Sequence, residues 1–259
     1  MKTVRSIVCE GFMISIFLIL GLGGRGVAAE IHVMSAGAVK VAVTELAKDF
    51  QKEKGHEVKF TFATVGALQQ KIAAGERADL FIMSDTAIED LIKKGVVASG
   101  SKTDIARVGI GVAVREGKPL PEISTPEAVK KALLSAKSLV YMDPSKGGSS
   151  GIHFAKVVEL MGIADALRNK TVLWPSGYAA EALLKGEAEI CIHQISEILA
   201  VKGVTLVGPL PKEIQKVTIY SAGLVNGAAT PDAAKSFIQF LMTPSARPKF
   251  VAVGLDYKE

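Results

Sequence analysis

Hydroxyl, amide and lysine side chains recur in this chain where an apolar strand pattern gives way to a helix pattern. Ammonium groups, hydroxyls and the free backbone N–H groups of helix starts all stabilise anions. The glycine-rich stretch 143–151 adds a backbone that can wrap around an anion, although a flexible serine-capped loop is the alternative interpretation. We therefore expect an anion site, and its candidate ligand-binding residues are Ser35, Lys40, Thr64, Ser84, Lys146, Ser149, Ser150 and Gln194.

Two histidines and one glutamate could move protons. His193 ends an expected strand and Glu197 follows it by about one helical turn, so an imidazole and a carboxyl group can face each other. If the protein is an enzyme, His193, His153 and Glu197 are the candidate catalytic residues. In the alternative interpretation, His153 is a surface helix residue and His193 is a strand-end histidine whose hydrogen bonds are satisfied within the fold.

Metal and nucleotide sites are not expected. No two of the four histidines have metal-ligand spacing, and the two cysteines, Cys9 and Cys191, form no cluster. The phosphate-binding patterns GxxxxGK(S/T) and GxGxxG do not occur. We therefore predict no metal and no cofactor, and we expect His32 and His56 to be structural.

Stretch 31–50 must position the first candidate residues. Its apolar start predicts a buried strand, the small residues 35–38 predict a tight turn, and Val43, Leu46 and Phe50 mark one face of a helix. Two more strand–turn–helix units follow, with strands expected over 58–62 and 78–83. This alternation predicts a parallel sheet whose ligand crevice lies at the carboxyl ends of its strands.

Two long apolar runs, 107–114 and 217–225, predict strands that cross between two lobes. We expect an α/β protein with a two-lobed binding-protein fold, in which each lobe is a mostly parallel sheet flanked by helices. The expected boundaries are 1–29 for a signal peptide, 30–108 with 222–259 for the first lobe, and 109–221 for the second. Two lobes joined by two crossings predict a cleft that closes on a ligand.

The N-terminal stretch has the features of a cleavable secretory signal. Lys2 and Arg5 precede the uncharged run 11–22, and small residues lead to an expected cleavage after Ala29. An uncleaved membrane anchor is the alternative, but the uncharged run is shorter than the ~20 residues that span a bilayer. Without the signal, 28 basic and 25 acidic residues leave a net charge of +3, and no basic run with interleaved aromatics suggests nucleic-acid binding. We expect a soluble periplasmic monomer.

The element order, together with Val58 to Ile82 (VKFTFATVGALQQKIAAGERADLFI), 186–189, Asp143-Pro144 and Gly151-Ile152, resembles the molybdate-binding proteins of ABC importers. The resemblance covers nearly all of the chain after residue 29. It implies a periplasmic solute-binding protein with an anionic ligand and a possible ABC permease as its partner. The two serines and the tyrosine with which that family holds its oxyanion fall on Ala38, near Val65-Gly66 and on Gln194. These departures favour a ligand other than molybdate, tungstate or sulfate.

The same fold is also similar to the bacterial aconitate isomerases, which interconvert trans- and cis-aconitate. That resemblance implies a proton transfer next to a carboxylate, with lysines holding the carboxylates. Capture of a small di- or tricarboxylate is the function that the cleft residues favour. Aconitate isomerisation is the alternative, and binding of a molybdate-type oxyanion is the third.

Overall fold

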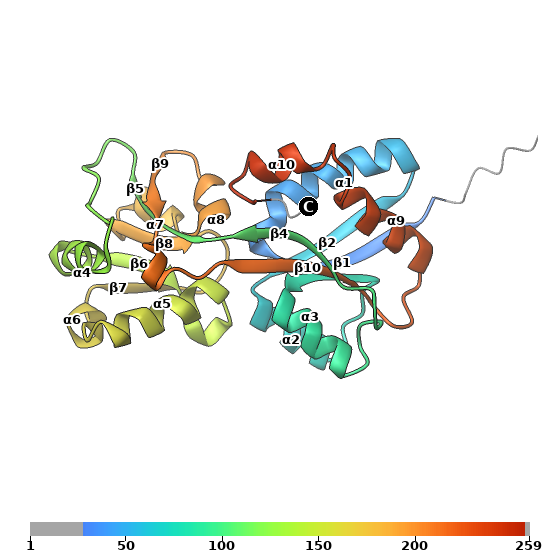
Figure 1. Ribbon diagram of the computed structural model, residues 1–259, viewed down its shortest axis with the longest axis horizontal. Helices are drawn as coiled ribbons and strands as arrows, with labels where there is room; N and C mark the ends of the chain where they lie inside the picture. The colour runs from blue at the N-terminus through green and yellow to red at the C-terminus, as the bar shows by residue number, and fades with distance from the viewer. Residues whose placement is uncertain (1–27, 257–259) are drawn as a thin grey trace, which may run out of the picture.

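The computed structural model describes residues 28–256 of the 259-residue chain, so the expected signal peptide lies almost wholly outside the described residues. Two five-stranded sheets, each with helices on both faces, form two lobes (Figure 1). This confirms the predicted two-lobed α/β fold. Among the described residues, no helix is long and apolar enough to cross a membrane.

The first lobe contains both ends of the described chain. Its sheet has the order β2-β1-β3-β10-β4, in which β1 pairs in parallel with β2 and β3, and β10 pairs antiparallel with β3 and β4. Its elements are β1 (Glu30–Ala36), a 3-10 turn η1 (Gly37–Val39), α1 (Lys40–Lys54), β2 (Glu57–Ala63), α2 (Val65–Ala73), β3 (Leu80–Ser84), α3 (Asp85–Lys93), β4 (Thr103–Val108), β10 (Thr218–Leu224), α9 (Pro231–Leu241) and α10 (Arg247–Val251).

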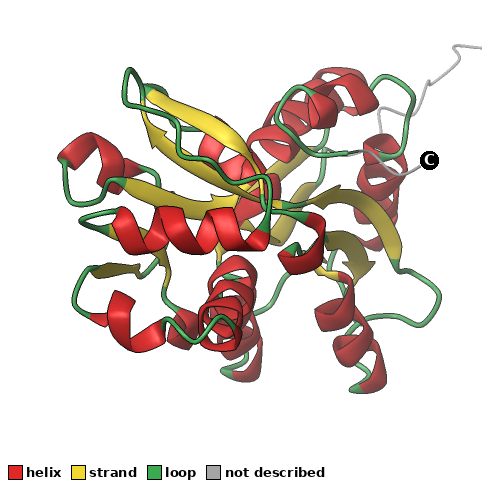
Figure 2. Ribbon diagram, turned by 60° about the vertical axis from the view of Figure 1, so that its left-hand side comes forward, coloured by secondary structure: helices red, strands yellow, loops and turns green. Residues whose placement is uncertain are grey.

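The second lobe, which comes forward in Figure 2, repeats this plan with the strand order β7-β6-β8-β5-β9. Strand β6 pairs in parallel with β7 and β8, whereas β5 pairs antiparallel with β8 and β9. Its elements are β5 (Ile110–Arg115), α4 (Pro126–Ser135), β6 (Leu139–Met142), a 3-10 turn η2 (Pro144–Lys146), α5 (Ser149–Leu160), α6 (Ala164–Arg168), β7 (Thr171–Trp174), α7 (Glu181–Lys185), β8 (Ile190–Gln194), α8 (Ile195–Leu199), β9 (Val204–Pro209) and a 3-10 turn η3 (Lys212–Ile214).

The chain passes between the lobes at Gly109, between β4 and β5, and again just before β10 (Figure 1). The Gln215 side chain joins these two crossings: its Oε1 accepts from Ile110 N–H at 2.7 Å, and its Nε2 donates to the carbonyls of Ile110 and Leu210. Strand β10 pairs with the first sheet from Thr218 onward, so the change of sheet precedes the expected boundary at 221/222. The residue limits of the two lobes stay a prediction.

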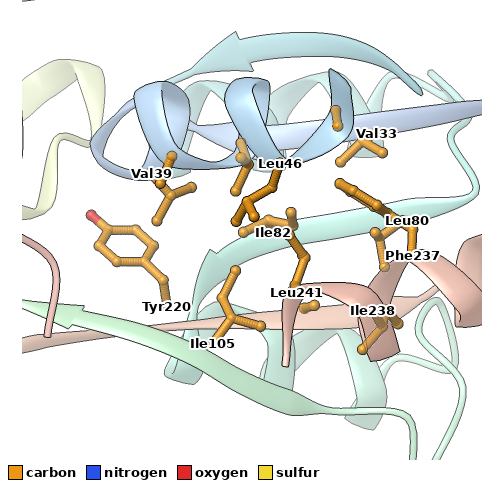
Figure 3. Close-up of a cluster of buried hydrophobic side chains, with 14 of the residues drawn as sticks. Val33, Val39, Leu46, Leu80, Ile82, Ile105, Tyr220, Phe237, Ile238 and Leu241 are labelled. Carbon is orange, nitrogen blue, oxygen red and sulfur yellow. The ribbon is translucent and has the colours of Figure 1, made fainter. Parts of the chain in front are cut away.

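Buried apolar side chains cover both faces of each sheet. In the first lobe, α1, α9 and α10 pack over one face, where Val39, Leu46, Phe237 and Leu241 are buried against the strands (Figure 3). Tyr220 of β10 belongs to this cluster. Burial of side chains of this size stabilises the fold by about 1.5–3 kcal/mol each, so the sheets form a rigid base for the loops at their carboxyl edges.

Local signals in the sequence explain where several helices begin and end. Helix α1 ends at Gly55, whose φ of 77° is the left-handed conformation that glycine adopts without strain. Thr64 and Thr125 cap α2 and α4, because their hydroxyls accept from the backbone N–H three residues later. Both caps were visible in the sequence as hydroxyl residues before an apolar helix pattern.

Candidate functional site

A cavity of about 560 Å³ lies between the lobes. The first lobe lines it with the ends of β1 and β2 and the starts of α1 and α2, and the second lobe with the starts of α5 and α8 and the loop before α7. This size falls within the ~300–1,000 Å³ of small-molecule sites. The cavity therefore occupies the carboxyl edges of both sheets, where strand order in the sequence predicted a ligand crevice.

The cavity brings together seven of the residues proposed from the sequence. They come from four different helix starts and from the end of β8, although they are spread over more than half of the chain. The seven are Lys40, Thr64, Ser149, Ser150, His193, Gln194 and Glu197.

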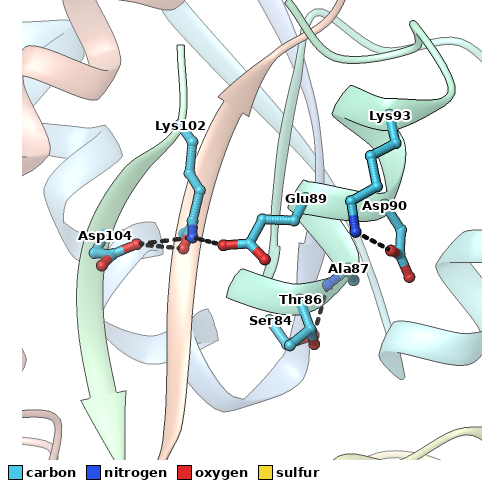
Figure 4. A network of polar contacts seen from close by, with 9 residues as sticks. Ser84, Thr86, Ala87, Glu89, Asp90, Lys93, Lys102 and Asp104 are labelled. Atoms are coloured by element: carbon cyan, nitrogen blue, oxygen red, sulfur yellow. Dashed lines mark hydrogen bonds and ion pairs between the residues drawn. The ribbon is translucent and has the colours of Figure 1, made fainter. Parts of the chain in front are cut away.

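Four other proposed residues lie away from the cavity lining. Ser35 is fully buried within β1 and its Oγ donates to Ala36 O at 3.3 Å. Ser84 caps α3, where its Oγ accepts from Ala87 N–H beside a surface network of charged residues (Figure 4). Lys146 is exposed, and its carbonyl accepts a hydrogen bond from Thr64 Oγ1 of the first lobe. His153 lies at 2.8 Å from Ile214 O, so it faces η3.

A buried polar cluster of His193, Ser150 and Glu197, which we call the inner end of the cavity, lies where β8 ends. His193 Nδ1 lies 3.2 Å from Ser150 Oγ and 3.5 Å from Glu197 Oε2, and His193 Nε2 lies 3.4 Å from Gly177 O. A carbonyl can only accept, so Nε2 carries the hydrogen and Nδ1 is left as an acceptor. The Ser150 hydroxyl is then the nearer donor to Nδ1.

Burial shifts both titratable groups of this cluster toward their neutral forms. Desolvation lowers the pKa of His193 to about 4, although the bond to Gly177 O opposes the shift. Desolvation raises the pKa of Glu197 to about 8. At pH 7 the imidazole is therefore neutral and most of Glu197 is protonated, so this end of the cavity carries little negative charge.

The part of the cavity lining around Lys40 is suited to anions. Lys40 lies with its Nζ 5.5 Å from the Phe62 ring centroid and 5.7 Å from that of Tyr178, so it sits between rings from the two lobes. Among residues 28–256, Lys40 has no carboxylate within ion-pair distance. Helices α1, α2 and α5 also begin at the cavity, and the positive ends of their dipoles favour negative charge there. At the start of α2, Gly66 N–H and Ala67 N–H are already bonded, to Gly147 O and Thr64 Oγ1. Glu181, at the exposed mouth, is the opposing charge.

Direct contacts hold the two lobes together around this cavity. On one side, Gly66 N–H donates to Gly147 O at 3.2 Å and the Thr64 hydroxyl bonds Lys146 O. On the other side, Ser196 Oγ donates to Ala38 O at 2.7 Å. We call the contact of Thr64 and Gly66 with Lys146 and Gly147 the glycine latch. The lobes are therefore in contact on both sides of the cavity, which is the arrangement of a closed cleft.

Sequence reasoning missed two tyrosines and one backbone group. Tyr220 reaches the cavity from β10, and Tyr178 and Gly177 reach it from the loop before α7. Tyr220 follows the alternation of an ordinary strand, so the sequence pattern predicts only that its side chain lies in the hydrophobic core. The loop 175–180 has no motif, although a lone aromatic residue after Gly177 was a weak signal. Within the described part of the chain, no group of three His, Cys, Asp or Glu residues could hold a metal ion.

Residues 31–256 match the family model described as bacterial extracellular solute-binding protein. The chain belongs to this family. It is 30% identical over 231 residues to the aconitate isomerase of a Pseudomonas species, and the aligned region covers 87% of each chain. It is 28% identical over 246 residues to the molybdate-binding protein ModA of Escherichia coli K12, covering 93% of this chain and 95% of that one.

The fold agrees with that assignment. The periplasmic molybdate-binding protein of Azotobacter vinelandii superimposes with a TM-score of 0.74 at 19% identity, covering 88% of this solute-binding chain and all of that one. The resemblance to molybdate-binding proteins placed their oxyanion-binding side chains on Ala38, near Val65-Gly66 and on Gln194, and Ala38, Val65 and Gln194 line the cavity.

Proposed function

We propose that this protein is a periplasmic receptor that captures a small organic anion with more than one carboxylate and delivers it, as a monomer, to an ABC permease. The observation that carries the proposal is that Lys40 and the starts of α1, α2 and α5, which come from both lobes, face one interlobe cavity. An anion held there contacts both lobes at once, so its binding stabilises the closed cleft.

Two unlike sets of side chains line the cavity, and they favour a carboxylate ligand over a tetrahedral oxyanion. Lys40 offers a full positive charge, whereas Ser150, Gln194 and Glu197 offer neutral donors and acceptors. A compact oxyanion presents the same acceptor on every side and does not use this difference. A di- or tricarboxylate can place one carboxylate at Lys40 and another group at the inner end.

Calorimetry with the mature protein tests this proposal. The panel is propane-1,2,3-tricarboxylate, citrate, trans-aconitate, succinate, molybdate and sulfate, and we expect a carboxylate to bind most tightly. Lys40→Ala should lose about 1.5–3 kcal/mol of affinity, roughly 10- to 150-fold, because a charge-assisted hydrogen bond is lost. Lys146→Ala is the matched control and should bind like the wild type. Tightest binding of molybdate or sulfate, or equal losses in the two variants, would contradict the proposal.

A second candidate function is aconitate isomerisation. The specific observation in its favour is the buried cluster of His193, Glu197 and Ser150, because strongly shifted pKa values in a cleft are typical of acid–base chemistry. In that reaction a base removes a proton next to a carboxylate and the proton returns at another carbon. Nuclear magnetic resonance of the protein with trans-aconitate would reveal cis-aconitate directly.

The variant His193→Gln separates the two functions. In an isomerase it should still bind trans-aconitate but turn over at least a hundredfold more slowly, whether the imidazole is the base itself or positions Glu197. In a receptor it should weaken binding by about 1 kcal/mol, the worth of one hydrogen bond. Saturable binding of trans-aconitate by the wild type without turnover at any pH would assign the protein as a transport receptor.

A further inference from the structure

The Glu197 carboxyl group lies at the inner end of the cavity without a cation to neutralise it. Its side chain is only 11% exposed, and among residues 28–256 no lysine or arginine lies within ion-pair distance of it. Its Oε1 lies 2.9 Å from the position that a Cβ on Gly37 would occupy, so the carboxyl is pressed against the first lobe. An ionised carboxylate without a partner is costly in such a place, whereas the protonated form is tolerated.

Among residues 28–256, the hydrogen of a protonated Glu197 makes no short hydrogen bond. It meets His193 Nδ1, but the 3.5 Å separation from Oε2 is longer than a good hydrogen bond, and Ser150 Oγ lies closer to the same nitrogen at 3.2 Å. His193 itself is only 2% exposed, with its other nitrogen toward Gly177 O. Glu197 is therefore the member of the pair that can offer a hydrogen to the cavity.

We propose that Glu197 is protonated when the ligand arrives and donates its hydrogen to a ligand carboxylate, which makes it the specificity residue of the inner end. This inference rests on the proposed anion-binding function. The bond is a charge-assisted O–H···O⁻ contact, which is among the stronger hydrogen bonds in proteins. A ligand with carboxylates at both ends would then pair one with Lys40 and the other with Glu197.

The groups around Glu197 leave it as the one that titrates near neutral pH. Burial raises the pKa of Tyr220, Tyr178 and Cys191, and the charge of Glu197 adds to each shift, so all three stay neutral. The titratable groups that face Glu197 or share its cavity are His193 and Cys191 of β8, Tyr178 before α7, Glu181 of α7, Tyr220 of β10 and Lys40 of α1. Carboxylate ligands are fully ionised above pH 7.

Two variants test the inference, first in the absence of a ligand and then in its presence. Glu197→Gln keeps the shape and a neutral donor, and Glu181→Gln is the matched control because it makes the same change at the exposed mouth of the cavity. Without ligand, the denaturation midpoints of the wild type and Glu181→Gln should fall from pH 6.5 to about 8, because the folded state still holds the proton of Glu197 that the unfolded state has released, and they should level off above the folded pKa of about 8. The midpoint of Glu197→Gln should stay level.

With propane-1,2,3-tricarboxylate as the probe, which has no double bond to shift, wild-type affinity should fall about tenfold from pH 7 to 9, since the pKa of Glu197 is about 8. Glu181→Gln should bind more tightly and show the same fall, whereas Glu197→Gln should bind within about threefold of wild type at pH 7 and show no fall. The proposal is overturned if Glu197→Gln shows the pH profile of the wild type. It is also overturned if Glu197→Gln folds but no longer binds the probe. If no carboxylate binds the wild type, the proposed function fails and the donor role with it, while the ligand-free titration still decides whether Glu197 holds the proton.

Discussion

Substitution of Gly147 by alanine should hold the cleft open. A Cβ at this position would lie 2.5 Å from Gly66 Cα, a backbone atom of the opposite lobe, against an ordinary carbon contact of about 3.5–4 Å. The loop cannot turn aside easily, because Ser145 N–H is bonded to Asp143 Oδ1 and Gly147 N–H to Pro144 O. The lobes must therefore separate by about 1 Å at this edge.

The separation breaks the glycine latch. Two hydrogen bonds are lost, from Gly66 N–H to Gly147 O and from the Thr64 hydroxyl to Lys146 O. At roughly 0.5–1.5 kcal/mol each, the closed state loses about 1–3 kcal/mol, which lowers ligand affinity by about 5- to 150-fold. The φ of 73° at Gly147 adds strain of about 1–2 kcal/mol for alanine, but this strain is present in the open and closed states alike and lowers only stability.

Gly162→Ala is the control for that strain. Its φ is 67° and nothing lies within 4 Å of its Cβ position, so it carries the backbone effect without the contact between lobes. Calorimetry with the tightest carboxylate of the panel should show the loss in Gly147→Ala only, and small-angle scattering should show a smaller ligand-induced compaction for that variant. Unchanged affinity in Gly147→Ala, or an equal loss in Gly162→Ala, would refute the role of the latch.

Two further predictions concern stability. Gln215→Ala removes four side-chain hydrogen bonds to the backbone at the crossings and should lower the free energy of unfolding by about 1–3 kcal/mol, measured with denaturant; an unchanged value would show that these bonds contribute nothing to stability. The pKa of His193 is about 4 in the folded state against an ordinary value of 6.5, so this residue lowers stability as the pH drops below 6.5. The pKa of Glu197 is about 8 in the folded state against an ordinary value of 4.5, so this residue lowers stability as the pH rises above 4.5. Wild-type stability should thus be level from pH 4.5 to 6.5, whereas that of His193→Gln should fall by about 3 kcal/mol over this range, and parallel curves for the two proteins would contradict this.

The strand and helix order was predictable because alternating apolar periods and local caps carry it. The strand–turn–helix unit 31–50 became β1, η1 and α1, and the run 107–114 was correctly expected to change sheets. That run divides at Gly109, where Gln215 takes the backbone bonds of Ile110. This break depends on a side chain more than a hundred residues away, which no local pattern can reveal.

The candidate site was predictable where its residues sit at helix starts or at the end of β8. Lys40, Thr64 and Ser149 reach the cavity because the carboxyl ends of neighbouring strands meet. Lys146 has the same kind of local sequence, yet the turn η2 directs its carbonyl to the other lobe and its ammonium group to solvent. Whether a loop presents its side chain or its backbone depends on a few torsion angles, and a sequence pattern does not specify them.

The position of β10 between β3 and β4 determines the order in which the lobes can be completed. All five strands of the second sheet lie between Ile110 and Pro209, so that sheet can form as soon as these residues are present. The first sheet must wait, because β4 has no neighbour except β10, and β3 keeps a bare edge until residues 218–224 arrive. Strand β3 (Leu80–Ser84) is buried along its whole length in the folded protein, so during synthesis and refolding its unpaired edge is the segment exposed longest to mispairing. We therefore expect a chaperone to bind this segment before the others.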